Sequence, residues 1–327
     1  MKKLKTALLL IMSIIIMMSS YSNSLAYTRS DLNSKISTTS AFILKTVSKP
    51  EVSSLGGEWV ILGLSRGEIK VPEKYYENYY KNVESAVKSK KGVLHDKKYT
   101  EYSRVILALT AIGKDPSDVS GYNLLEKLSD FEKVTLQGIN GPVFALLALD
   151  SGAYEMPFNK SAKTNATREL YLDYILKKQL SDGGFALSGN TADPDITAMA
   201  LQALAKYQER KDVKMATQKA LSCLSKIQKS DGGFESWGSA NLESSAQVLT
   251  ALCELGISDK DRRFIKNGKT VADNVLSYYT KNGFLHVRNG KGNTLMATEQ
   301  AFYSLVGLQR VLDSKTSLYR MNEKGTK

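Results

Sequence analysis

The 327-residue chain has very little cysteine and histidine: Cys223, Cys253, His95 and His286 are all it contains. Two cysteines exclude a disulfide scaffold and a thiolate zinc cluster. Because the two histidines lie in glycine-containing loops far apart in the sequence, they do not make up a catalytic metal site either. We therefore expect no bound metal and no required cofactor. A single bridge between the cysteines and two buried free thiols both remain open.

Acidic residues are fewer than basic ones. The chain has 45 Lys and Arg against 33 Asp and Glu, a formal net charge of +12. The basic residues are scattered along helical patterns and are not clustered with stacking aromatic side chains, as a nucleic-acid groove requires. We therefore expect no nucleic acid, and we interpret the charge as a source of solubility and of attraction to an anionic cell envelope.

Long apolar runs are absent except near the N-terminus. The uncharged run 7–18 follows Lys2, Lys3 and Lys5 and precedes Ser24-Leu25-Ala26, a small-x-small sequence. The run is too short to cross ~30 Å of hydrocarbon comfortably, and the whole pattern is typical of a signal peptide cleaved after Ala26. We expect residues 1–26 to be removed and the mature protein to be secreted or held at the cell surface.

Strand signals are also scarce, and a repeat takes their place. Residues 179–185 read Gln-Leu-Ser-Asp-Gly-Gly-Phe, and residues 228–234 read Gln-Lys-Ser-Asp-Gly-Gly-Phe, 49 positions later. Degenerate copies of this glycine turn occur at Gly56-Gly57, Gly92, Gly138 and Gly283. A period of roughly 40–55 residues is typical of a two-helix unit.

The helices that follow the turns align on six leucines, here called the anchor leucines: Leu64, Leu109, Leu149, Leu204, Leu252 and Leu305. The residue before each anchor is small, and the third residue before it is large and apolar, which makes one packed stripe. More charged helices are predicted between them, at 72–90, 164–180, 212–229 and 269–280. The sequence thus predicts an all-α, (α/α)6 toroid over residues 27–313, followed by a polar tail at 314–327.

The starts of the inner helices supply the candidate site. Asp193 before Pro194 is typical of an N-cap, and Asp195 in the first turn complements the helix dipole. Residues 140–142 and 239–241 resemble the same capping arrangement. Because the inner helices all begin at one mouth of a toroid, we expect a ligand there to meet Asp195, Thr197, Trp237, Asn241, Glu243, His286, Glu299 and Gln300.

Two motifs carry a family resemblance. The Gln-x-x-Asp-Gly-Gly-Phe pattern resembles the QW-type repeat of squalene and terpene cyclases, and residues 193–198 resemble the acidic Asp-x-Asp-Asp-Thr-Ala motif of class II cyclases. The helix from Asp195 to Leu204 is also similar to the α-domains of transcobalamin and intrinsic factor. The resemblance, to the terpenoid cyclase/protein prenyltransferase superfamily, covers residues 50–312 and implies an α/α toroid.

The resemblance leaves several functions to compare. Prenyltransferase zinc ligands would fall on Asp195, Thr197 and Gln300, which is a poor ligand set. A thioester needs a cysteine beside Glu299-Gln300, and none is near. A cyclase would use Asp195 as its proton donor, with Asp193 beside it, although Ile196 replaces the third acid of the motif. A glycoside hydrolase would pair Asp195 with Glu243 across the mouth.

The favoured interpretation is a non-catalytic binding or cell-surface module, similar to the transcobalamin-like carriers in size and export signal. Its first candidate ligands are a corrinoid such as cobalamin and an isoprenoid-like apolar molecule, with a β-rich partner domain or protein to cover the site. The first alternative is a class II terpene or squalene cyclase-like enzyme. A glycoside hydrolase ranks below both.

Overall fold

The computed structural model describes residues 27–281, 283–290 and 294–322. The predicted signal peptide, residues 1–26, lies outside them. Within the described residues no helix is both long and apolar enough to cross a bilayer.

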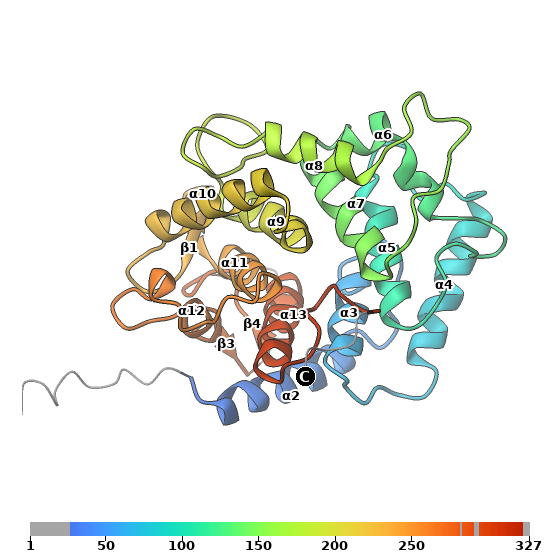
Figure 1. Cartoon of the computed structure of the whole chain (residues 1–327). Coiled ribbons are helices and arrows are strands. Elements are labelled where there is room, and N and C mark those ends of the chain that lie inside the picture. Colours follow the sequence, from blue (N-terminus) through green and yellow to red (C-terminus); the bar gives the residue numbers. More distant parts are fainter. Residues whose placement is uncertain (1–26, 282, 291–293, 323–327) are drawn as a thin grey trace, which may run out of the picture.

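Inner helices form a closed ring at the centre of the molecule (Figure 1). They are α3 (Glu58–Arg66), α5 (Thr100–Ala111), α7 (Asn140–Ser151), α9 (Pro194–Leu204), α11 (Leu242–Glu254) and α13 (Thr294–Leu312). Each packs against the next, and α13 packs against both α11 and α3. The contact between the last and the first inner helix closes the ring, so the predicted (α/α)6 toroid is confirmed.

Outer helices surround this ring. They are α2 (Arg29–Thr46), α4 (Tyr75–Ser89), α8 (Arg168–Lys177), α10 (Lys211–Ile227) and α12 (Val271–Leu276), with the short η1 (Leu125–Ser129) and α6 (Phe131–Thr135) outside α7. Two further 3-10 turns, η2 (Ala205–Tyr207) and η3 (Arg262–Phe264), lie in connections. The sequence pattern had not singled out α2, which begins at a capping box between Thr28 and Asp31.

Two short hairpins lie at the mouth end of the ring. Strand β1 (Phe234–Ser236) pairs antiparallel with β2 (Ser239–Asn241), so that Phe234 faces Asn241. Strand β3 (Tyr279–Thr280) pairs with β4 (Gly283–Phe284). Both hairpins lead into an inner helix, α11 and α13 respectively, so they position the starts of those helices.

The repeated glycine turn has the same backbone conformation in all six units. Its glycines have positive φ values between 61° and 95° at Gly56, Gly92, Gly138, Gly183, Gly232 and Gly283. Space is also limiting, since a Cβ at Gly232 would lie 2.6 Å from the Thr270 carbonyl oxygen. A residue with a side chain is therefore strained at this point of the turn.

The glutamine of the motif binds the turn from inside. Gln179 donates from Nε2 to the carbonyl oxygens of Gly183 and Ala216, each at 2.8 Å. Gln228 donates in the same way to Gly232 at 2.8 Å and to Phe264 at 3.0 Å. The motif thus ties each turn to its own backbone and to the next outer segment.

A hydroxyl on the inner helix fixes the other side of the turn. The Phe185 N–H donates to Thr197 Oγ1 at 2.9 Å, and the Phe234 N–H donates to Ser245 Oγ at 3.2 Å. In the last unit the Phe284 N–H donates to Thr298 Oγ1 at 2.8 Å. The turn and the first turn of the inner helix therefore form one unit.

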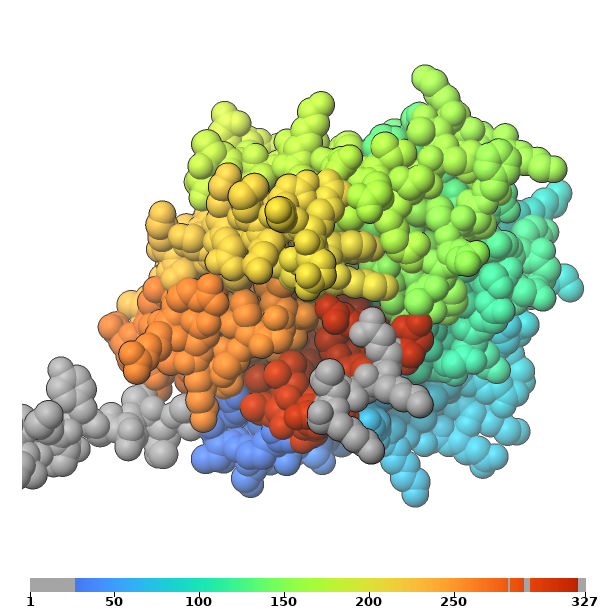
Figure 2. All heavy atoms as spheres, viewed as in Figure 1, coloured from blue at the N-terminus to red at the C-terminus, as the bar shows by residue number. Residues whose placement is uncertain are grey.

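The segment 314–322 covers the other end of the ring, where the inner helices finish. In Figure 2 the red C-terminal part lies between the yellow and the green parts of the ring. Buried Leu318 and Tyr319 pack there, and the Met321 N–H donates to the Ser151 carbonyl oxygen at 3.0 Å. The polar residues that the sequence presents as a tail are in part a cover for the hollow.

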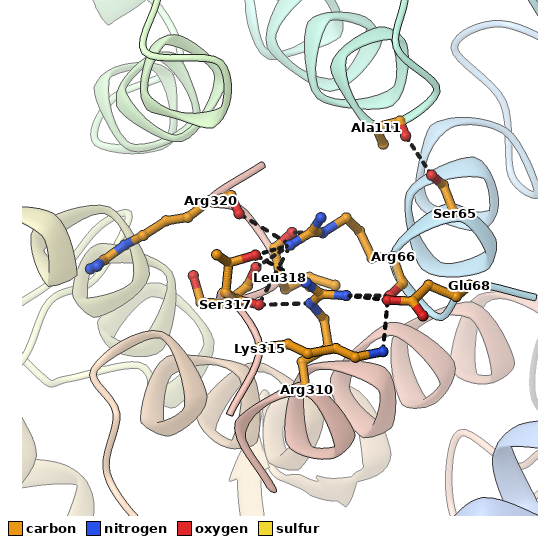
Figure 3. A network of polar contacts seen from close by, with 10 residues as sticks. Ser65, Arg66, Glu68, Ala111, Arg310, Lys315, Ser317, Leu318 and Arg320 are labelled. Carbon is orange, nitrogen blue, oxygen red and sulfur yellow. Dashed lines mark hydrogen bonds and ion pairs between the residues drawn. The ribbon is translucent and has the colours of Figure 1, made fainter. Parts of the chain in front are cut away.

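Two arginines hold this cover through its backbone (Figure 3). Arg66 donates to the carbonyl oxygens of Ser317 at 2.7 Å and Leu318 at 2.9 Å. Arg310 donates to Thr316 at 2.7 Å and to Arg66 at 2.7 Å. Burial, together with the Arg310 charge, lowers the pKa of Arg66 to about 10.

Cys223 and Cys253 are buried free thiols, which settles the question of a bridge.

Replacing Gln228 with alanine tests the turn. Two buried carbonyl groups lose their donor, and we expect the free energy of unfolding to fall by about 2–4 kcal/mol. Gln218→Ala, at an exposed position of the neighbouring α10, is the control and should change it by less than about 0.5 kcal/mol. Equal effects of the two substitutions in urea unfolding would show that the turn is not held by Gln228.

Arg66→Met tests the cover. The substitution removes the hydrogen-bond donors to the backbone of residues 316–320, and we expect the free energy of unfolding to fall by about 3 kcal/mol. Lys315→Met breaks only the exposed contact with Glu68 and should cost less than about 1 kcal/mol. Thermal melts of both variants make the comparison, and an Arg66 variant as stable as the Lys315 variant contradicts it.

Candidate active site

A layer of side chains faces the hollow from the position five residues before each anchor leucine, here called the inward position. Its members are Trp59, Arg104, Phe144, Met199, Gln247 and Gln300. All six are partly exposed, whereas the residues around them on the same helices are mostly buried. The stripe positions carry similar residue types in all six units, whereas the inward position carries a different mixture of aromatic, basic, apolar and amide side chains. The six units therefore differ in chemistry at the inward position.

The inward residues meet across the ring. The Trp59 ring lies 5.9 Å from Phe144 and 5.5 Å from Tyr303, centroid to centroid. Gln247 donates from Nε2 to Gln300 Oε1 at 3.0 Å and to the Tyr303 hydroxyl at 2.7 Å. Aromatic and amide side chains thus form the floor of the mouth.

A pocket of about 510 Å³ opens beside this floor, at the start of α9. Its lining includes Asn140, Leu187, Asp195, Met199 and Trp237. The Trp237 side chain is 90% exposed at the tip of the β1–β2 hairpin, where its φ is 52°. Its wall combines apolar side chains with polar and acidic ones, and a concave site with convergent polar groups is a candidate small-molecule site.

The Asp195 carboxyl is the polar group at the base of the pocket. Asp193 caps α9 by accepting from the N–H groups of Asp195 and Ile196, which confirms the predicted cap and fixes the first turn. The Ser236 hydroxyl donates to Asp195 Oδ2 at 3.3 Å. No hydrogen-bond partner contacts Oδ1 within the described residues, although this atom is buried.

Burial raises the pKa of Asp195 to about 6. Hydrogen bonds from Ser244 and Ser236 oppose this rise, while the charges of Asp193 and Glu243 add to it. The carboxyl is therefore partly protonated near neutral pH, and Oδ1, the oxygen without a protein partner, is available to carry the proton into the pocket.

Glu243 and His286 form a pair next to this pocket. Glu243 Oε2 lies 2.7 Å from His286 Nδ1, and Glu243 Oε1 is buried without a partner in the described part of the chain. Glu243 occupies the same repeat position on α11 as Asp195 occupies on α9. Glu243 lies close enough to Asp195 for its charge to raise the pKa of the Asp195 carboxyl.

A second acidic group lies on the opposite side of the mouth, around Arg104. Glu299 accepts from the Gly56 N–H at 2.9 Å, and burial raises its pKa to about 7. Burial also raises the pKa of Glu58, against the charge of Arg104. Arg104 itself contacts Glu101 at 2.6 Å. Glu299 thus belongs to a buried network and not to the lining of the Asp195 pocket.

The remaining predicted residues have structural contacts. Thr197 is fully buried and binds the glycine turn, so it does not reach the mouth. Asn241 caps α11 through the Ser244 N–H and donates to Ser236 Oγ at 3.0 Å. Gln300 belongs to the amide floor. Asp193, Asp195 and Trp237 are the predicted residues that share one pocket.

Asn140 is a pocket residue whose role the sequence pattern misassigns. The pattern suggested that Asn140 caps α7. In the structure Ile139 is at the N-cap position, no side chain caps the helix, and Asn140 is its first residue. Its Oδ1 is buried and has no partner among the described residues. The repeat alignment carried the missing signal, since Asn140, Asp195 and Glu243 all lie nine residues before their anchor leucines.

The described residues contain no group of three His, Cys, Asp or Glu side chains arranged to hold a metal ion. What the pocket offers chemically is therefore a carboxylic acid with a raised pKa in a partly apolar setting, beside an unpaired amide oxygen. Such a group can act as a general acid.

Comparison with known proteins finds no matching family model and no curated relative. The fold is similar to that of solved structures. The type II terpene cyclase MstE from Scytonema has a TM-score of 0.54 and 15% identity, covering 86% of this chain and 99% of that one. The unsaturated glucuronyl hydrolase of Bacillus sp. GL1 has a TM-score of 0.51 and 15% identity, and the match covers 90% of this chain and 99% of the hydrolase.

The ent-copalyl diphosphate synthase from Streptomyces platensis is similar over a smaller part of its length. The TM-score is 0.53 at 15% identity, and the match covers 76% of this chain but 49% of the synthase. These likenesses establish that the chain has the α/α toroid fold that these structures share.

The favoured expectation of a non-catalytic corrinoid carrier is wrong on this comparison. The similar structures are terpene cyclases and a glucuronyl hydrolase, which are enzymes. The physical reason for the error is that the inner-helix wording shared with the carriers describes helix packing. In this chain the residues that differ from unit to unit lie at the inward positions and in the mouth loops.

Asp195→Asn tests the environment of the carboxyl through stability. Since the pKa of Asp195 in the folded protein lies above 3.8, the ordinary value for an aspartate, the native state favours the protonated acid, and stability falls as the pH rises from about 4 to about 7. The asparagine variant lacks this cost. We therefore expect its free energy of unfolding to rise by about 3 kcal/mol relative to that of the unmodified protein over that range. Asp173→Asn, at an exposed position on α8, is the control. A constant difference from pH 4 to 7 in urea unfolding contradicts the raised pKa.

Proposed function

We propose that this chain is an enzyme of the class II terpene cyclase type, which uses Asp195 to protonate a carbon–carbon double bond of an isoprenoid. The observation that carries the proposal is the Asp195 carboxyl. It lines a pocket that also has apolar side chains, its pKa is raised, and one of its oxygens lacks a partner among the described residues. The likeness in fold to the MstE cyclase supports the same class.

The proton donor in this proposal is Asp195 Oδ1. Transfer to the alkene places the proton on one carbon and leaves a cation on the other, while the carboxyl becomes a carboxylate. The hydroxyl of Ser236, with Ser244, stabilises that carboxylate, because hydrogen bonds to the charged form lower its energy. Ile196 replaces the third acid of the cyclase motif, and these two serines supply polar contacts from β1 and α11 in its place.

The mouth contains groups that suit the cation. An aromatic face attracts a positive charge, so Trp59, Phe144 and Trp237 can stabilise it as the next double bond attacks and closes a ring. Loss of a proton from the final cation restores a double bond, so that the whole reaction is an isomerisation with no other reactant. Leu187 and Met199 supply apolar contacts for the hydrocarbon chain of the substrate.

A glycoside hydrolase is the second candidate, and one observation favours it. Asp195 and Glu243 stand at equivalent positions on neighbouring inner helices, and Glu243 is oriented by His286. An acid with a raised pKa and a second carboxyl group across the mouth is the usual arrangement for glycosidic bond cleavage. The Bacillus glucuronyl hydrolase has a related fold. An assay with an unsaturated glucuronyl disaccharide separates the two candidates.

Export remains a prediction from residues 1–26, and the tests below use the chain that begins at Tyr27. We propose that the enzyme acts outside the cytoplasmic membrane or at the cell envelope, where the excess of basic residues favours contact with anionic surfaces.

The pH dependence and one variant test the proposal. A general acid must be protonated, so we expect kcat/KM for conversion of a geranylgeranyl substrate to fall as the pH rises above about 6. Asp195→Asn should lower kcat by at least about 100-fold. Asp173→Asn should leave it unchanged. Product from the Asp195 variant at the normal rate, with incorporation of solvent deuterium, would exclude Asp195 as the proton source.

A further inference from the structure

The pocket in front of Asp195 carries charge of one sign. The ionisable side chains of its wall are Asp193, Asp195 and Glu235, and of the residues that the structure describes no Lys, Arg or His belongs to that wall. A ligand group with two or three negative charges would therefore meet no counter-charge on this wall, in a site partly shielded from water where an uncompensated charge costs more than in bulk solvent.

The nearest basic groups are already paired. Lys229 contacts Glu235 at 2.6 Å, and Arg104, at the inward position of α5, contacts Glu101 at 2.6 Å. Arg104 also lies in the field of Glu58 and Glu299, since its charge acts on the pKa of both. Recruiting either cation to a phosphate would leave a carboxylate without its counter-charge.

One polar group of the pocket lacks a partner and needs a donor. Asn140 Oδ1, on α7, is buried and has no hydrogen-bond partner in the described part of the chain, and Asn140 lines the same pocket as Asp195 on the neighbouring α9. An unpaired buried acceptor costs about 1–3 kcal/mol. A hydroxyl of a ligand would remove this cost by donating to Oδ1.

We propose, building on the cyclase function proposed above, that the substrate is an isoprenoid with an uncharged hydrogen-bond donor such as a hydroxyl at its polar end, which Asn140 receives, and that the pocket rejects a diphosphate. The protein would differ in this respect from the synthase of similar fold whose name specifies a diphosphate. Asp195 then remains directed at the double bond, while Asn140 positions the other end of the molecule.

Three matched ligands test the proposal in equilibrium binding to the chain from Tyr27, followed by tryptophan fluorescence at low salt. They are geranylgeraniol, its methyl ether, which has no donor, and geranylgeranyl diphosphate. We expect the alcohol to bind at least about tenfold more tightly than the diphosphate and about fivefold more tightly than the ether. Added salt should narrow the first difference and leave the second unchanged, because only the first is due to charge repulsion.

Variants assign these differences to residues. Asn140→Ala should abolish the preference for the alcohol over the ether, and Asn140→Asp, which keeps an acceptor, should retain it. Glu235→Gln should narrow the difference between alcohol and diphosphate, because it removes a charge from the wall. Glu209→Gln, an exposed acid away from the pocket, is the matched control and should not change it.

The outcomes separate this inference from the function on which it builds. Diphosphate binding that equals or exceeds alcohol binding overturns the inference about the head group, even if cyclised product forms. An alcohol that binds with the expected preferences but gives no product overturns the cyclase function and leaves the inference about the pocket standing. An Asn140→Ala variant that keeps the full preference for the alcohol overturns the role of Asn140.

Discussion

The site depends on the joint between each glycine turn and the inner helix that follows it. In the unit that holds Asp195, Gly183 has a backbone conformation that favours glycine, Gln179 binds the turn, and Thr197 accepts from the N–H of Phe185. Because Thr197 lies two residues after Asp195, the same hydrogen bond that fixes the turn fixes the start of α9. The position of the carboxyl is therefore set by backbone contacts that do not involve the pocket itself.

The chemistry follows from where the inner helices begin and end. Their first turns come together at the mouth, where partly exposed aromatic, amide and acidic side chains remain, and their last turns are covered by the segment 314–322. Burial near the starts of the inner helices raises the pKa values of Asp195, Glu58 and Glu299.

The ring could be predicted from the sequence because residue types that recur in every unit mark the positions at which the helices pack. The glycine turns, the anchor leucines and the cap at Asp193 all follow from local backbone rules and appear as predicted. The cover by 314–322 could not be predicted, since Arg66 and Arg310 bind it through carbonyl oxygens that every residue possesses. Asn140 was taken for a cap because its amide resembles that of Asn241, yet the helix begins one residue earlier and leaves that amide oxygen unpaired.

Function was harder to predict because packing and chemistry occupy different positions of the repeat. The stripe before each anchor leucine is uniform across the six units and reports helix packing, and the resemblance that rested on it led to the incorrect carrier hypothesis. The inward position, which runs from Trp59 to Gln300, and the loop that carries Trp237 differ from unit to unit. The most direct test is to follow the Asp195 carboxyl carbon by NMR across a pH titration of the chain that begins at Tyr27. We expect a midpoint near pH 6, and a midpoint near 4, that of a solvated aspartate, would contradict the raised pKa.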